Sequence, residues 1–208
     1  MRSPIVQEVE AALRGLSQLA ERVAREMAGD VEQVVELVLH ALDDGGRLFF
    51  CGNGGSAADA QHLATEYVVR FQRHRRALAA IALTTDTSLL TAAANDYGFE
   101  HVFERQVRAL ARPGDVLFLH STSGESPNLI EAALAAREQG VRTVALLARG
   151  GGRLRELVDI ALVLPTEDGA RAQEVQLAIG HAICDAIERR VVEQQGEGEG
   201  EGEGEGEG

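Results

Sequence analysis

The chain has 208 residues and a formal net charge of −13, and residues 196–208 alternate strictly between glycine and glutamate. Six acidic residues lie in that tract, so the remaining chain carries −7 and has no broad basic face, which argues against a nucleic-acid partner. No apolar run reaches the length of a membrane span, so we expect no membrane partner and a cytoplasmic protein. None of the twenty basic residues is a lysine, which excludes a Schiff-base aldolase and the lysine-dependent phosphate loop.

The predicted elements begin with two amphipathic helices over 5–27 and 31–43. Strand and helix patterns then alternate along the chain. We expect strands at 47–51, 79–83, 115–120, 142–147 and 159–164, and helices at 56–70, 86–95, 100–111, 127–139, 152–157 and 170–194. This alternation predicts a three-layer αβα sandwich with a five-stranded parallel sheet, of the flavodoxin or Rossmann type, preceded by the N-terminal helices.

Three segments follow from this pattern. Residues 1–45 are expected to pack on the main domain and on an oligomer interface, and residues 46–195 to form that domain. The Gly-Glu tract has no apolar side chain to bury and its like charges repel one another, so we expect residues 196–208 to be disordered. The two cysteines, Cys51 and Cys184, do not form a disulfide framework, and we expect reduced thiols in the core.

Two short polar segments each follow a buried-strand pattern and open a helical one. We call them the glycine loop (residues 52–56) and the serine loop (residues 121–126). Ser126 and Pro127 fit an N-cap followed by proline at the first helical position, so hydroxyl groups surround a helix N-terminus. Because ligands bind beyond the carboxyl ends of parallel strands, we expect the two loops to share one crevice and to hold a phosphorylated sugar.

Further candidates lie on the predicted helices. His62 and Glu66 are four residues apart on the helix that the glycine loop opens, so they share one face. Such a pair can chelate a divalent metal or transfer protons, and the alternative is an ordinary surface pair. His120 precedes the serine loop, where we expect a buried, neutral imidazole.

These segments together resemble the phosphoheptose isomerases, the sedoheptulose 7-phosphate isomerase branch of the sugar isomerase (SIS) domain family. The resemblance runs from the N-terminal helices to about residue 193. It is carried by the glycine loop with Asp59, Gln61, His62 and Glu66, by Asn95 and Asp96, by the serine loop, and by Arg171, Gln173, Glu174 and His181.

The resemblance implies a homotetrameric ketose–aldose isomerase with sites at subunit interfaces. It would convert sedoheptulose 7-phosphate to D-glycero-D-manno-heptose 7-phosphate, for heptose biosynthesis, through an enediol. The resemblance assigns a zinc ion to His62, Glu66, Gln173 and His181. It assigns substrate contacts to Asn53, Gly54, Gly55, Glu66, Asn95, Asp96, Ser121, Thr122, Ser123, Ser126 and Gln173.

The spacing of Gln173 and His181 raises a geometric question, because eight helical residues rise about 12 Å. Both can reach one ion only if the helix begins near Gln173 or if one ligand comes from a neighbouring subunit. The sequence also departs from the family at three positions: Ala170 stands where aspartate is common, Gln176 where histidine is common and Glu125 where asparagine is common. We expect the Glu125 side chain to point away from the phosphate.

Glu66 is the candidate base and His181 the candidate acid of the isomerisation. The main alternative is a non-catalytic SIS protein similar to the DnaA initiator-associating protein, a regulator of replication initiation, which residues 80–86 and 106–110 also resemble. Such proteins lack the carboxylate and the last histidine that this chain keeps. A third possibility is an SIS ligand sensor, whereas the spacing of the glycine loop disfavours a Rossmann dehydrogenase.

Overall fold

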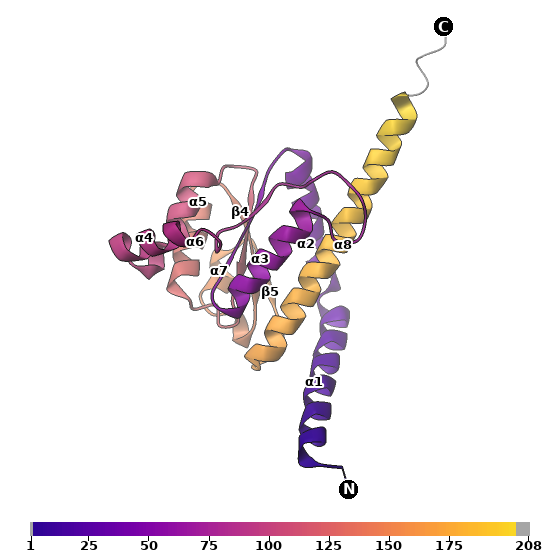
Figure 1. The fold of residues 1–208 in the computed structure, drawn as a ribbon, viewed down its shortest axis with the longest axis vertical. Coiled ribbons are helices and arrows are strands. Elements are labelled where there is room, and N and C mark those ends of the chain that lie inside the picture. Colours follow the sequence, from indigo (N-terminus) through magenta and orange to yellow (C-terminus); the bar gives the residue numbers. More distant parts are fainter. Residues whose placement is uncertain (1, 203–208) are drawn as a thin grey trace.

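The computed structural model describes residues 2–202, and Figure 1 shows the fold. Five parallel strands form one sheet in the order β2-β1-β3-β4-β5. They are β1 (Leu48–Gly52), β2 (Ala80–Ala82), β3 (Val116–His120), β4 (Arg142–Leu147) and β5 (Ile160–Val163). The predicted five-stranded parallel sheet is confirmed, with β2 shorter than expected.

Helices cover both faces of the sheet, so the predicted αβα sandwich is also confirmed. One face carries α1 (Pro4–Glu26), α2 (Ala28–Asp43), α3 (Gly55–Val68) and α8 (Gly169–Gly202). The other face carries α4 (Thr87–Tyr97), α5 (Glu104–Leu110), α6 (Pro127–Glu138) and α7 (Leu154–Leu157), with the short 3₁₀ helices η1 (Phe99–His101) and η2 (Arg149–Gly151).

Burial on both faces explains why the strand sequences are continuously apolar. In β1, Leu48 and Phe50 belong to the core under α3 and α8, whereas Phe49 and Cys51 belong to the core under α5 and α6. Side chains of a strand alternate between faces, so a strand with a core on each side needs apolar residues at every position.

The two terminal helices extend beyond the body of the domain (Figure 1). The second half of α1 packs on α8, while Ile5, Val9 and Leu13 in its first half are exposed. The α8 helix continues to Gly202 and so enters the Gly-Glu tract, whose disorder stays a prediction; residues 203–208 lie outside the described residues. Extending a formed helix adds one hydrogen bond per residue and needs no new nucleus, so a polar tract can follow its turns. Within residues 2–202, no helix combines the length and apolar character needed to cross a membrane.

The sheet order places the two polar loops together. After β1 the chain moves to one side to form β2 and then returns to form β3 on the other side of β1. The helix that follows β1, α3, packs on one face of the sheet, and the helix that follows β3, α6, packs on the other. A crevice therefore opens between the carboxyl ends of β1 and β3. The glycine loop follows β1 and the serine loop follows β3, so both lie at this crevice.

Candidate active site

A polar hollow of about 130 Å³ lies at the carboxyl ends of β1 and β3. Its lining consists of Asn53, Ser56, His120, Ser121, Thr122, Ser123, Ser126 and Gln173. Ser126 is the N-cap residue of α6, but its hydroxyl makes no capping hydrogen bond and so remains available to a ligand. The N-terminus of α6 favours negative charge, and the hydroxyls can donate to anionic oxygens, so the hollow suits a phosphate group.

The serine loop is held in shape by its own hydroxyls and by a close contact with η2. Ser121 Oγ accepts a hydrogen bond from the Gly124 N–H at 3.0 Å. Gly124 has φ +67°, and a Cβ there would lie 1.9 Å from the Gly151 carbonyl oxygen, so only glycine fits. Glu125 does not line the hollow, and its carboxylate accepts a hydrogen bond from the Arg153 N–H at 2.9 Å.

An amide pair joins the glycine loop to the first turn of α6. The Asn53 amide donates to Asn128 Oδ1 at 2.9 Å, and the Asn128 amide donates to Asn53 Oδ1 at 2.8 Å. Asn128 is buried in the first turn of α6 and was not among the predicted site residues. Nothing in its sequence context marks it, because its partner lies 75 positions away.

His62, Glu66 and His181 form a second group of polar side chains. His62 Nε2 lies 2.8 Å from His181 Nε2 and 3.3 Å from Glu66 Oε1. One ligand atom of each residue lies within 4.8 Å of the others. His62 and Glu66 on α3 therefore meet His181 on α8 within one chain.

The close approach of α3 and α8 brings this cluster together. A Cβ on Gly180 would lie 2.6 Å from Leu63 Cδ2, so glycine at this position allows the two helices to pack closely. The helices contact each other at successive levels, at Ser56 with Gln173 and at Leu63 with Gly180, and Figure 1 shows them side by side.

Gln173 lies against the glycine loop and lines the polar hollow, so it is not part of the cluster. Its Nε2 is 3.4 Å from Ser56 Oγ, and a Cβ on Gly55 would lie 2.8 Å from its Oε1. The α8 helix begins at Gly169, so Gln173 and His181 both belong to its regular part and are separated by about 12 Å along the axis. The hollow and the cluster are thus two parts of one site along the α3–α8 pair.

Comparisons of the sequence and of the fold with known proteins point to the same family. A sequence model of the SIS domain family matches residues 13–148. The phosphoheptose isomerase of Geobacter sulfurreducens is 50% identical over 187 residues, which cover 90% of this chain and 99% of that protein. The solved phosphoheptose isomerase GmhA of Neisseria gonorrhoeae is 44% identical with a TM-score of 0.83, covering 88% of this chain and 98% of the other.

The chain belongs to the phosphoheptose isomerase family of SIS-domain proteins. A solved phosphoheptose isomerase from Francisella tularensis shares the same fold at a TM-score of 0.87, with 32% identity over 90% of this chain and 100% of the other. The family resemblance seen in the motifs is therefore confirmed.

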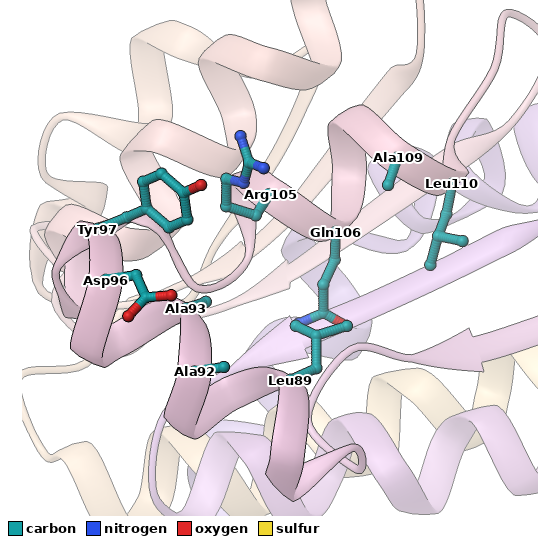
Figure 2. A pocket seen from close by; sticks show the side chains of 9 residues that line it. All are labelled: Leu89, Ala92, Ala93, Asp96, Tyr97, Arg105, Gln106, Ala109 and Leu110. Atoms are coloured by element: carbon teal, nitrogen blue, oxygen red, sulfur yellow. The ribbon is translucent and has the colours of Figure 1, made fainter.

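Asn95 and Asp96, two predicted substrate contacts of this phosphoheptose isomerase family member, do not line the polar hollow at the serine loop of the same chain. Asn95 and Asp96 are exposed on the last turn of α4, where the Asn95 amide donates to Asp96 Oδ1 at 2.7 Å. Figure 2 shows Asp96 at the edge of a different hollow, of about 300 Å³, between α4 and α5, where Arg105 stacks over Tyr97.

The surroundings of His181 include a residue that the sequence did not single out. The Phe71 ring stacks on the His181 imidazole with 5.1 Å between ring centroids and 26° between planes. Burial lowers the pKa of His181, the nearby His62 lowers it further, and Glu66 acts in the opposite direction. Phe71 belongs to an irregular segment after α3, and no periodic pattern marks its role.

Proposed function

We propose that this protein converts sedoheptulose 7-phosphate to D-glycero-D-manno-heptose 7-phosphate through an enediol, as a step in heptose biosynthesis. Membership in the phosphoheptose isomerase family supports the reaction class. The observation that carries the proposal is the separation of two complementary sites, a phosphate-sized polar hollow and a carboxylate–imidazole cluster, about two turns apart along α3 and α8.

This separation matches the shape of the substrate. A seven-carbon sugar carries its phosphate on C7, while the isomerisation takes place at C1 and C2, at the far end of the chain. With the phosphate in the hollow, an extended sugar places its reacting carbons near the cluster. The phosphate site then contributes by positioning the reacting end. Its proposed contacts are Asn53, Gly54, Gly55, Ser121, Thr122, Ser123, Ser126 and Gln173.

In the proposed mechanism Glu66 removes a proton from C1 of the ketose, and His181 donates a proton to the C2 oxygen. The resulting enediol is converted to the aldose when a proton returns to C2 and the C1 hydroxyl loses its proton. The Phe71 ring stacked on His181 keeps the imidazole in one orientation. No atoms are gained or lost, as an isomerisation requires.

The donor set of the cluster fits zinc, which binds imidazole nitrogen and carboxylate oxygen. His62, Glu66 and His181 would hold the ion, and bound zinc would supply Lewis acidity toward the substrate oxygens. Gln173, the fourth ligand implied by the family, lies at the hollow within one chain, so as a ligand it would have to move or come from a neighbouring subunit.

We further propose a homotetramer with its sites near subunit interfaces. The exposed apolar residues Ile5, Val9 and Leu13 on the extended half of α1 support association. So does an apolar hollow of about 350 Å³ between α1, α2 and α8. Asn95 and Asp96 remain proposed substrate contacts, which a neighbouring subunit would have to supply.

Incubating the purified protein with sedoheptulose 7-phosphate tests the function directly. We expect the aldose 7-phosphate to appear, as followed by nuclear magnetic resonance of the sugar. Saturable binding without product would instead indicate a ligand sensor, and neither binding nor product would favour the replication-regulator alternative. Both of these outcomes contradict the proposed function.

Zinc binding gives a separate prediction. After treatment with a chelator, the protein should bind one zinc ion per chain, measured by calorimetry and by metal analysis. Since loss of a residue that only supports a ligand costs 10- to 100-fold in affinity, His62→Ala should weaken binding by more than about 100-fold. His74→Ala, which removes an exposed histidine from the segment after α3, is the matched control and should bind zinc normally. Equal affinity in the two variants would exclude His62 as a ligand.

A further inference from the structure

His120 is a buried polar residue that the proposed mechanism does not use. It is the last residue of β3, directly before the serine loop, and is 1% exposed. Its ring packs near Phe50, with 6.3 Å between ring centroids. Among the residues that the structure describes, neither ring nitrogen has a hydrogen-bond partner. Burying such a group unpaired destabilises the folded protein, so its presence calls for a physical explanation.

The imidazole is neutral under ordinary conditions. Burial lowers the pKa of His120 to about 4, as we expected for a buried histidine at this position. A neutral imidazole has one N–H donor and one acceptor nitrogen. His120 can therefore donate a hydrogen bond without bringing a full charge into the core.

Two spaces adjoin the His120 ring, and they differ in what they can hold. One is a void of about 10 Å³, in whose lining Tyr67 is the one polar side chain besides His120 itself. A buried water needs at least this volume together with two to four polar partners, so this void does not supply a partner for the imidazole. The other space is the polar hollow of about 130 Å³, which His120 shares with the serine loop.

The hollow is suited to an anionic group rather than to a whole sugar. Its volume is well below the 300–1,000 Å³ of typical small-molecule sites, and its walls are hydroxyl and amide groups. A second buried polar side chain lies behind the serine loop: Gln176 is fully buried, and its amide donates to the Ser121 carbonyl oxygen at 3.5 Å. The base of the serine loop is therefore polar on the core side as well as on the ligand side.

We propose that His120 contacts the substrate, donating its N–H to an oxygen of the phosphate group that the serine loop holds. This inference rests on the proposed function, because it takes a phosphorylated sugar as the ligand. It adds a donor from the core side of the loop to the hydroxyls and backbone N–H groups on the other sides. The unpaired imidazole of His120 destabilises the ligand-free protein, and the bound phosphate supplies the missing hydrogen-bond partner.

The test compares His120→Phe with His120→Gln. The phenylalanine fits apolar surroundings and removes the donor, whereas the glutamine keeps an amide N–H. We expect His120→Phe to weaken binding of inorganic phosphate and of sedoheptulose 7-phosphate by about 10- to 100-fold in calorimetry, the range for a hydrogen bond to a charged group. KM should rise with kcat nearly unchanged, and His120→Gln should recover part of the affinity.

Thermal unfolding of the ligand-free variants separates this role from a structural one. Because His120→Phe removes an unpaired polar group, its unfolding temperature should equal or exceed that of the wild type. Unchanged phosphate affinity in folded His120→Phe overturns the proposal. An equal loss of phosphate affinity in His120→Phe and His120→Gln also overturns it, because it would show that only the packing of the His120 ring matters. If His120→Phe does not fold, the affinity of His120→Leu decides in the same way.

Ser123→Ala provides the reference for the phosphate site itself. Wild-type protein that binds phosphate but forms no aldose contradicts the proposed reaction and leaves the His120 contact standing. Wild-type protein that binds neither probe overturns the phosphate site, and with it the contact to His120. The two failures are therefore distinguishable.

Discussion

Glu66→Gln should lower kcat by about 10²- to 10⁴-fold while leaving the fold intact, because the amide cannot accept the C1 proton. Glu66 is half-buried on α3 and supplies the carboxylate of the cluster with His62 and His181. Glutamine has nearly the same shape, so packing of α3 against α8 should not change. The measurement is the steady-state rate of aldose formation, alongside the circular dichroism spectrum.

The control for this variant is Glu36→Gln, which makes the same chemical change at an exposed position on α2. It should retain full activity. Metal analysis of Glu66→Gln adds a second readout: an inactive variant that keeps its zinc assigns Glu66 to proton transfer, and one that loses zinc assigns it to metal binding. A rate near that of the wild type would remove Glu66 from both roles.

Glu188→Gln should lower the free energy of unfolding by about 3–5 kcal/mol, the typical cost of removing one partner from a buried ion pair. The Glu188 side chain is 1% exposed and accepts hydrogen bonds from the backbone N–H groups of Phe71, Gln72 and Arg73 at 2.9, 2.7 and 2.8 Å. The Arg75 guanidinium lies 3.5 Å away and is also buried. Urea unfolding curves measure the loss.

Asp185→Asn is the matched control, since Asp185 lies one turn before Glu188 on α8 and also pairs with Arg73. Its ion pairs with Arg73 and Arg189 are partly exposed, so each should contribute less than about 1 kcal/mol. If Glu188→Gln and Asp185→Asn lowered the free energy of unfolding by similar amounts, the buried Glu188 carboxylate would not be the main stabilising group of this segment. Because the Glu188 carboxylate holds the backbone of Phe71, which stacks on His181, Glu188→Gln should also reduce activity.

The stabilisation by Glu188 should depend on pH in a defined direction. Burial by itself would raise the pKa of Glu188, but the three backbone N–H donors and Arg75 outweigh it and hold the pKa below its usual value of 4.5. The contribution is thus fully present above the pKa of the unfolded chain and is lost as pH falls through the lower folded value. The difference between wild type and Glu188→Gln should therefore shrink in acid.

The features predicted correctly from the sequence are local or repetitive. Continuous apolar strands, alternating helices and the two polar loops indicate the parallel sheet and the edge at which the site lies. The pairing of His62 with Glu66 follows from helical spacing alone. The disorder of the Gly-Glu tract stays a prediction, and composition alone did not indicate that α8 continues into the tract as far as Gly202.

The sequence by itself determined the fold class, the two loops and the chemical types in the site, because each depends on neighbours within a few residues. Only the tertiary structure decided which of them meet. His62 and His181 are 119 positions apart and meet because Gly180 lets α8 approach α3, and Asn53 meets Asn128 because β1 pairs with β3. The unpaired imidazole of His120 is likewise visible only in the packed core, since hydrogen-bond satisfaction depends on every surrounding element.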